Sequence, residues 1–416
     1  MKHWRRNLYA ICAAQLLTLI GFSSYLSFIP YYLQTFTGLG DTEAMNWTAG
    51  FQTAGMLAMM IAAPIWGGLA DRYGRKIMLI RSTAAALVLV ALMGVVTAPG
   101  QLLVLRVFQG VLCGTVSAAM TLVATGTPAK NLGQSLGMLQ MTQFLANALG
   151  PFLGGRAAVA FGYRAVFPGA AALMAISTTV IVFLVRETRD PQAPVVQRAK
   201  FRLSPALLTQ TVGANALILI GSLTGTSFAN SVLQPVIPMY IKSLAPDVDR
   251  LATLAGSLTS VTAVTAAAAA VGIGWIGDRF GQKRTLMVSM VGVALLAIPQ
   301  AFVSTATQLM IWRAVHGVFM GGIMPTANAL LAGSTPPDRR GSVLGLASGA
   351  QAGGNALGPA VGAAVANAWG MSSSFLTTSA VFALLTTLVG AFVRSAPPAE
   401  PEEPAATLAP AAEGKG

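Results

Sequence analysis

Acidic residues, histidines and cysteines are scarce in this chain of 416 residues, and their scarcity excludes several classes of protein. The chain has 13 Asp and Glu, 2 His and 2 Cys, against 26 Lys and Arg. Cys12 and Cys113 lie in different apolar runs, where small buried hydrophobes are expected and a disulfide or metal site is not. No nucleophile with a base, metal cluster or phosphate-binding loop is found, so neither an enzyme nor a cofactor is expected.

Long apolar runs are abundant instead. Hydrophobic residues make up 54% of the chain and charged residues 9%, with 44 glycines, as in a protein whose surface faces lipid. Windows of about 20 apolar residues predict twelve transmembrane helices and an all-α membrane protein. These windows lie near 8–36, 47–69, 77–97, 101–124, 134–160, 165–185, 206–240, 252–276, 285–303, 306–332, 342–368 and 371–394.

An internal repeat divides the chain in two. Residues 67–76 read GGLADRYGRK, and residues 274–283 read GWIGDRFGQK at an offset of 207 positions. Asn147 to Pro151 recur as Asn355 to Pro359, and Arg106 recurs as Arg313. Parallel repeats of several helices are typical of transporters built from two bundles. The repeat predicts two pseudo-symmetric six-helix bundles, with a linker and a tail. Their ranges are 1–185 (amino-terminal bundle), 186–205 (cytoplasmic linker), 206–394 (carboxy-terminal bundle) and 395–416 (disordered cytoplasmic tail).

The distribution of positive charge predicts the orientation. Most Lys and Arg fall in segments that are cytoplasmic if the amino terminus is inside, as the positive-inside rule requires, and both termini are then cytoplasmic. The formal net charge of +13 therefore reflects the lipid bilayer and does not indicate nucleic acid as a partner. Lys2, Arg5 and Arg6 precede an apolar run that is too long for a signal peptide and lacks a cleavage site.

Three patterns resemble the signature motifs of the major facilitator superfamily. They are the loop 67–76, the pattern Leu102-x3-Arg106-x2-Gln109-Gly110, and the pattern Gly137-x8-Ala146-x3-Gly150-Pro151-x2-Gly154-Gly155. The third resembles the antiporter signature of the twelve-span drug:proton exporters, although Ala146 replaces a usual glycine.

The resemblance implies the major facilitator fold in a bacterial cytoplasmic (inner) membrane. It further implies export of hydrophobic or amphiphilic compounds by alternating access, driven by a proton gradient, and a monomer is expected. Two alternatives stay open: a proton-coupled importer of a small nutrient, and a membrane receptor or scaffold that does not transport.

The two repeated loops are candidates for a conformational latch on the cytoplasmic side. An acid at such a turn can cap a neighbouring helix and pair with a nearby arginine. The candidate residues are Gly67, Asp71, Arg72, Gly74, Arg75, Gly274, Asp278, Arg279 and Gly281. By resemblance, Asp71 engages the eleventh span near Gly341 and Ser342, and Asp278 lies near Gln134 and Ser135. The alternative is that these loops only orient the protein by their charge.

Arg106 and Arg313 are predicted to lie inside spans, where an unpaired guanidinium is costly, so each should face polar partners or water. Gln109 and His316 follow one helical turn later on the same faces. For Arg106 the alternative is a side chain that snorkels to the cytoplasmic interface. Because no acid lies in a predicted span, proton coupling is implied by the resemblance alone. Its candidate carriers are His316, more often a hydrogen-bonding group in such a pocket, and Asp71.

The fifth predicted span carries the small residues of the antiporter motif. Gly137, Gly150, Gly154 and Gly155 lie on related faces and predict close approach to the other half, or generic tight packing, while Pro151 predicts a kink.

Neutral polar and aromatic residues on the inner spans are candidates for a substrate cavity, with helix packing as the alternative for each. A mostly apolar pocket with a few amides and rings suits amphiphilic small molecules. These residues are Tyr25, Phe28, Gln52, Gln140, Gln143, Phe144, Asn230, Gln234, Asn328 and Gln351.

Overall fold

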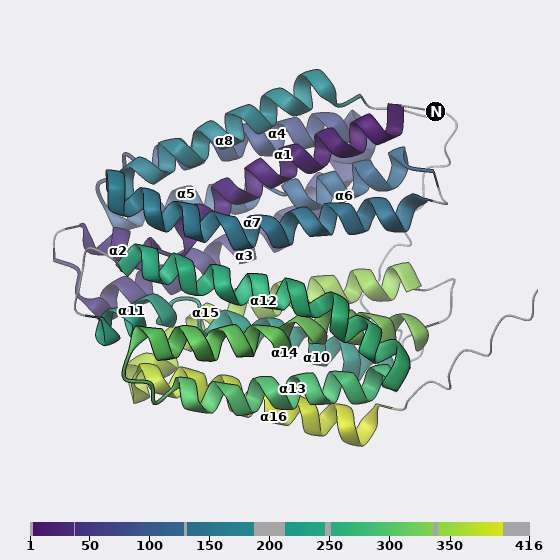
Figure 1. Ribbon diagram of the computed structural model, residues 1–416. Coiled ribbons are helices and arrows are strands. Elements are labelled where there is room, and N and C mark those ends of the chain that lie inside the picture. The colour runs from purple at the N-terminus through teal and green to yellow at the C-terminus, as the bar shows by residue number, and fades with distance from the viewer. Residues whose placement is uncertain are drawn as a thin grey trace, which may run out of the picture.

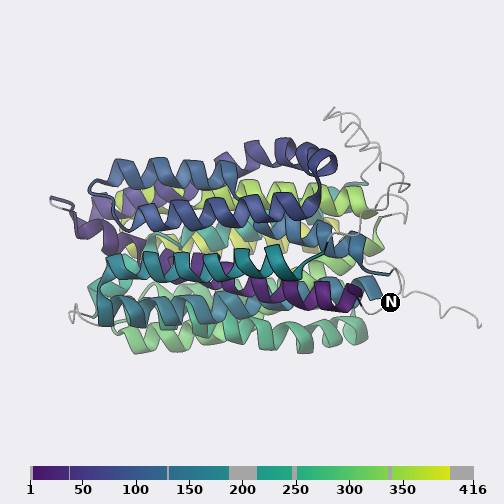
Figure 2. The ribbon, with the colours of Figure 1, turned by 90° about the horizontal axis from the view of Figure 1, so that it is seen from above.

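The computed structural model describes residues 3–36, 38–128, 131–186, 213–245, 251–335 and 340–393. Within these ranges every element of regular structure is a helix. The predicted tail, and the predicted linker beyond Arg186, lie outside the described residues. The helices run lengthwise beside one another in both views of the ribbon (Figures 1 and 2), so the predicted all-α bundle is confirmed.

The first half of the chain contains the first six predicted spans. Its helices are α1 (His3–Leu26), α2 (Ile29–Gln34), α3 (Asp41–Tyr73), α4 (Arg75–Met93), α5 (Pro99–Leu112), α6 (Thr115–Gly126), α7 (Leu132–Phe161) and α8 (Tyr163–Leu184). The first span corresponds to α1 and α2, which meet near Pro30, as the length of its apolar window suggested.

The second half repeats this order. Its helices are α10 (Ala214–Val232), α11 (Val236–Leu244), α12 (Leu251–Phe280), α13 (Gln282–Gln300), α14 (Ala306–Gly333), α15 (Arg340–Trp369) and α16 (Met371–Phe392). The short helix α11 contains Pro238 and is the counterpart of α2 with Pro30. The predicted repeat is therefore visible in the order and lengths of the helices.

The fourth span departs from the prediction of one continuous helix. It is broken at Cys113 and Gly114 into α5 and α6, and the side-chain amide of Gln15 donates to the carbonyl oxygen of Thr115 at 2.7 Å beside the break. Its counterpart α14 runs unbroken from Ala306 to Gly333. The repeat is thus imperfect at this point.

Eight stretches of the described residues are long and apolar enough to cross a membrane, judged by length and composition. They lie in α1, α4, α7, α8, α10 with α11, α12, α14 and α16. Of the remaining spans, the fourth is divided into two short helices, and α15 is rich in glycine and alanine, which have low hydropathy.

Single glycines make four of the turns between helices, and they form two repeat-related pairs. Gly74 and Gly281 have φ of 100° and 97°, and Gly162 and Gly370 have φ of 83° and 85°. Each lies alone between the end of one helix and the start of the next. Residues with a side chain rarely adopt this backbone conformation, so glycine allows adjacent spans to reverse direction within one residue.

The two halves lie side by side, and two pairs of long helices make most of the contact between them. α7 packs against α12, and α3 packs against α15. Because α7 and α15 are repeat-related, as are α3 and α12, the two contacts are equivalent under the pseudo-symmetry of the fold.

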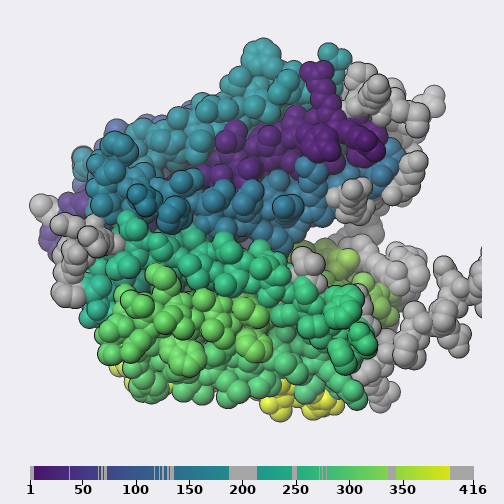
Figure 3. Space-filling model, in the orientation of Figure 1, coloured from purple at the N-terminus to yellow at the C-terminus, as the bar shows by residue number. Residues whose placement is uncertain are grey.

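The buried apolar residues form one cluster shared by both halves and one further cluster within each half. The shared cluster includes Tyr25, Tyr32 and Phe167 from the first half with Val236 and Tyr240 from the second. It lies at the end of the molecule opposite the start of α1, where α2 and α11 meet (Figure 1). At the other end the apolar clusters of the two halves are separate. Figure 3 shows the consequence, a cleft between the halves that opens at the end where α1 begins.

The positive φ of the single-glycine turns can be tested by substitution. Gly162→Ala is expected to destabilise the folded protein by about 1 to 3 kcal/mol, because alanine is strained at φ of 83° and ψ of 157°. Thermal unfolding of the purified protein in detergent measures the effect. Gly169→Ala in α8 is the control, since an added Cβ there meets nothing within 4 Å, and it should leave stability unchanged or slightly increased. Equal stability of the two variants would contradict the conformational role of Gly162.

Candidate functional site

Arg106 lies in α5 and is held by side chains from three helices. Its Nη1 donates to Oε1 of Gln109 at 2.5 Å, and the Gln109 amide Nε2 donates to the hydroxyl of Tyr25 on α1 at 3.2 Å. The guanidinium carbon lies 4.9 Å from the ring centroid of Phe51 on α3, a cation–π distance. A neutral amide, a hydroxyl and an aromatic face thus surround this charge, and no carboxylate of the described residues pairs with it.

Two glycines make room for this arrangement. A Cβ at Gly55 would lie 2.4 Å from Nε of Arg106, and a Cβ at Gly110 would lie 2.3 Å from the carbonyl oxygen of Gly55. These separations are too short for real atoms, so α3 and α5 can cross this closely only without side chains at both positions. The glycine at position 110 of the pattern from Leu102 to Gly110 is therefore explained by the close packing of α5 on α3.

The position of Arg106 argues against the alternative that its side chain snorkels to the cytoplasmic interface. α5 begins at Pro99, at the end of the bundle opposite the start of α1, and Arg106 lies two turns into it. Its side chain is 9% exposed and hydrogen-bonded inside the bundle. Arg106 is thus an internal charge.

Arg313 and His316 occupy the equivalent positions on α14. They are 7% and 2% exposed, and their face lies next to Gly317, which packs against Thr262 of α12. Among the described residues no hydrogen-bond partner is found for Nε or Nη1 of Arg313, or for either ring nitrogen of His316. The second half therefore places two buried polar groups together without the partners that Arg106 has.

The latch loops are shorter than predicted. Asp71 and Asp278 belong to the last turns of α3 and α12, which end at Tyr73 and Phe280. Both helices continue past the ends of their predicted apolar windows, which were 47–69 and 252–276. The turns themselves are Gly74 and Gly281.

The rest of the predicted latch is only partly described. Arg75 is the first residue of α4, and Arg279 has its guanidinium carbon 5.6 Å from the ring centroid of Trp275. Ser135, a predicted partner of Asp278, is buried. The remaining candidates lie outside the described side chains: Gly67, Asp71, Arg72, Gly274 and Asp278, with the predicted partners Gln134, Gly341 and Ser342. The contacts of the latch stay predictions.

The antiporter-motif helix α7 uses its glycines in two directions. A Cβ at Gly150 would lie 1.9 Å from Oγ of Ser23, and one at Gly154 would lie 1.8 Å from the carbonyl oxygen of Ser24, so both glycines pack against α1 of the same half. Gly155 alone approaches the other half, where its Cβ would lie 2.4 Å from the carbonyl oxygen of Ala252.

The predicted close approach to the other half is thus made by Gly155, whereas Gly150 and Gly154 follow the alternative of tight packing within one half. Gly137 is exposed, and an added Cβ there would meet nothing within 4 Å. Pro151 contributes to the contact between halves through its carbonyl oxygen, which lies 2.1 Å from the position of a Cβ at Gly256 of α12. α7 itself continues through Pro151 as one helix.

The candidate cavity residues divide by burial. Tyr25 and Phe28 do not line an open cavity in this conformation, because both are fully buried at the closed end, with their rings 5.3 Å from Phe167 and 5.6 Å from Tyr163. Gln52 is also buried. The exposed or half-buried candidates are Gln140, Gln143, Phe144, Asn230, Gln234, Asn328 and Gln351.

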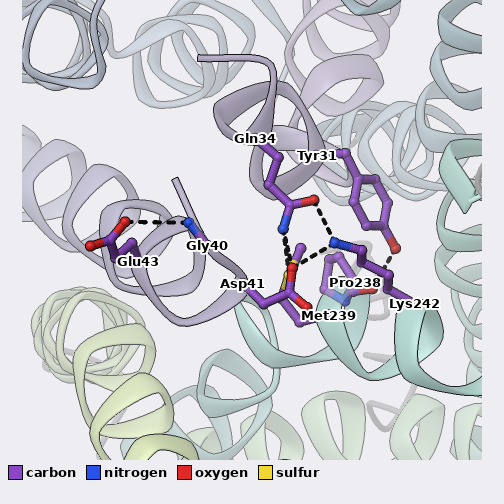
Figure 4. A network of polar contacts seen from close by, with 8 residues as sticks. All are labelled: Tyr31, Gln34, Gly40, Asp41, Glu43, Pro238, Met239 and Lys242. Atoms are coloured by element: carbon purple, nitrogen blue, oxygen red, sulfur yellow. Dashed lines mark hydrogen bonds and ion pairs between the residues drawn. The ribbon is translucent and has the colours of Figure 1, made fainter. Parts of the chain in front are cut away.

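A polar network that the sequence analysis did not identify joins the two halves at the closed end (Figure 4). Nζ of Lys242 on α11 lies 2.6 Å from Oδ1 of Asp41 at the start of α3 and donates to Oε1 of Gln34 on α2 at 3.1 Å. Nearby, the hydroxyl of Tyr31 donates to the carbonyl oxygen of Pro238. We call Tyr31, Gln34, Asp41, Pro238 and Lys242 the closed-end network.

A second contact of the same kind lies between α15 and α3. The side-chain amide of Asn367 donates to that of Asn46 at 2.7 Å. These side chains and the shared apolar cluster close the end opposite the cleft.

The internal repeat could have predicted one contact of the closed-end network from the sequence, the contact between Gln34 and Lys242. At the offset of 208 that relates Pro30 to Pro238, Gln34 corresponds to Lys242. Equivalent residues of two related halves meet when they lie near the pseudo-twofold axis, and these two do. A sequence reading that had placed this axis near the prolines would have paired them.

Two similar helical halves, closed together at one end and separated by a cleft at the other, define a membrane transporter with alternating access as its structural principle. Residues 11–248 and 225–414 match the sequence profile of the Major Facilitator Superfamily, and the chain belongs to this family. The resemblance seen in the three signature motifs is confirmed.

Two sequence relatives extend this result. The multidrug resistance protein MdtG of Klebsiella pneumoniae (strain 342) is 32% identical over 406 residues, which cover 97% of each chain. MdtG of Dickeya zeae (strain Ech586) is 33% identical over 383 residues, covering 91% of this chain and 92% of that protein. These relatives are transporters, and the chain is not an enzyme.

Solved structures show the same fold at low identity. A mutant of the nucleoside transporter NupG has a TM-score of 0.75 at 13% identity, covering 93% of this chain and all of that chain. A bacterial homologue of the human lysosomal transporter Spinster, solved inward-facing and occupied, also has a TM-score of 0.75 at 13% identity, covering 94% of this chain and 97% of that chain.

The ion pair of the closed-end network generates a second test. Asp41→Asn is expected to shift the protein toward the state in which this end opens, by up to about 1 kcal/mol or roughly fivefold in population, because the pair is partly exposed. Electron–electron distance measurements between spin labels at Val95 and Phe302, in a background without the native cysteines, measure the shift, since these exposed residues follow α4 and α13 on the two halves.

Glu43→Gln is the matched control for this measurement. The carboxylate of Glu43 lies in the same first turn of α3 but accepts from the backbone N–H of Gly40 in its own half, at 3.3 Å. The control should keep the wild-type distance distribution. Identical distributions for both variants would show that the ion pair does not hold this end closed.

Proposed function

We propose that this protein is a multidrug exporter that moves hydrophobic or amphiphilic compounds out of a bacterial cell in exchange for protons. The observation that carries the proposal is the 32% identity to a multidrug resistance protein MdtG over 97% of both chains. The antiporter-like pattern from Gly137 to Gly155 supports the direction of transport.

The conformation of the protein fits one state of such a cycle. The cleft opens at the end where α1 begins, which is the cytoplasmic end under the positive-inside orientation. This end also carries most of the basic residues. One of them, Lys76, donates to the carbonyl oxygen of Val182 within the first half. We therefore propose an inward-open state, a bacterial inner-membrane location, and cytoplasmic termini.

The substrate class follows from what the spans offer. The exposed and half-buried candidates are amides and an aromatic ring, including Gln140 and Phe144, which lie one turn apart on α7. Without a carboxylate in any predicted span, the pathway offers no strong anionic site for cations. Amphiphiles recognised by apolar contact and a few hydrogen bonds suit this surface.

Coupling to protons needs a group that changes its charge during the cycle. Asp71 at the end of α3 and His316 in α14 are the two candidates that the chain offers on the basis of the family resemblance. We propose that Asp71 also forms the latch that closes the cytoplasmic end when the external end opens. The protein is proposed to work as a monomer, since each chain contains both halves.

Everted membrane vesicles test the proposal. During respiration, addition of an amphiphilic drug is expected to release protons from the lumen, reported by a fluorescent pH probe. Asp71→Asn should insert normally and lose this response, because the latch would lack its charge, and Asp71→Glu should restore at least part of it.

Several results would contradict the exporter. Drug-dependent proton release of wild-type size in Asp71→Asn would show that Asp71 is neither the latch nor the proton carrier. For a drug shown independently to move, absence of proton release would point to uniport or another ion. Accumulation of a small nutrient in right-side-out vesicles would identify an importer, and binding without flux would identify a receptor or scaffold.

A further inference from the structure

Among the described residues no carboxylate pairs with Arg106 or Arg313. Of the thirteen acids, the four in described helices are at helix ends: Asp41 and Glu43 in the first turn of α3, and Asp71 and Asp278 in the last turns of α3 and α12. Gly317, one turn after Arg313, packs at Thr262, and Asp278 is 16 residues further along α12, about 24 Å away. No acid of α12 can therefore neutralise Arg313.

The two halves treat their buried arginines differently. In the first half, Gln109 accepts a hydrogen bond from Arg106, and Phe51 supplies an aromatic face to the guanidinium. The hydroxyl of Tyr25 accepts in turn from the Gln109 amide. At the repeat offsets of 207 and 208, the corresponding residues of the second half are His316, Leu233 and Leu258. The side-chain groups that satisfy Arg106 are thus replaced by two leucines and an imidazole.

The replacement leaves donors without acceptors. Arg313 and His316 are more than nine-tenths buried, and four of their nitrogens lack a hydrogen-bond partner among the described residues. A buried guanidinium without a counter-charge or acceptor is strongly destabilising, and the described residues supply neither to Nε and Nη1 of Arg313. The chemistry that matches a guanidinium with an adjacent imidazole is a small anion.

We propose that Arg313 and His316 form an anion-binding site in the second half, which takes one monovalent anion, either a halide-sized inorganic ion or the carboxylate of a bound amphiphile. The inference goes beyond drug export, because it assigns a binding role to two buried residues that the proposed transport of amphiphiles does not require. In the first half Nη1 of Arg106 is bonded to Gln109, and Nε alone of the Arg106 nitrogens is buried without a partner among the described residues. The pseudo-symmetric pair has thus diverged into one structural and one ligand-binding arginine.

Thermal unfolding of the purified full-length protein in detergent, in low-salt buffer, tests this site. Titration with sodium chloride, and separately with sodium benzoate, is expected to raise the unfolding midpoint of the wild type in a saturable way, because a ligand that binds only the folded state stabilises it. Arg313→Gln should lose this saturable rise. Any general effect of salt appears equally in the variant and is subtracted.

Arg106→Gln is the matched control, because it removes the equivalent charge of the first half and should keep the anion-dependent rise. A rise with chloride identifies an inorganic anion, a rise with benzoate alone identifies a carboxylate, and both outcomes support the site. No rise in the wild type with either salt, or an equal rise in Arg313→Gln, would overturn it.

If Arg313→Gln does not fold, the same anion titration is carried out on His316→Asn. Loss of the imidazole next to the anion is expected to weaken the apparent Kd roughly tenfold, as for one hydrogen bond to a charged group. An unchanged Kd in His316→Asn would remove His316 from the site and overturn the proposal in its stated form.

Discussion

The apolar cluster shared by the two halves at the closed end is the contact on which the rest of the structure depends. Tyr32 and Phe167 of the first half and Val236 and Tyr240 of the second belong to one buried cluster, whereas at the opposite end each half has its own. Apolar burial supplies most of the association, because the exposed Lys242–Asp41 pair contributes at most about 1 kcal/mol. The polar contacts next to this cluster join particular residues of the two halves. At the other end, where the apolar clusters are separate, a cleft remains between the halves.

Close helix packing explains how each half can move as a unit. Gly150 and Gly154 bring α7 against α1, and the related glycines Gly358 and Gly362 bring α15 against α10. On the same helix α7, Gly155 forms the contact with α12 of the other half. One helix thus serves both the interior of its half and the interface between the halves.

The two repeats differ most clearly in the fourth and tenth spans and in the surroundings of the internal arginines. The single-glycine turns at Gly74 and Gly281 are alike in both, since any bundle of this kind must reverse direction there. The fourth span is broken at Gly114 whereas α14 is continuous, and Arg106 has polar partners that Arg313 lacks. Backbone turns have been kept, while the environment of the internal charges has changed.

The sequence by itself determined the helical class, the order of the spans, the repeat and the family, because hydropathy, charge and motif spacing are local properties of the chain. It also located Arg106 beside Gln109, since one helical turn separates them. Only the tertiary structure decided that Tyr25 and Phe28 are buried at the closed end, that Gly155 alone of the motif glycines reaches the other half, and that Lys242 meets Asp41. These contacts join residues about 100 to 200 positions apart, and they depend on how the two halves are placed, which no local pattern encodes.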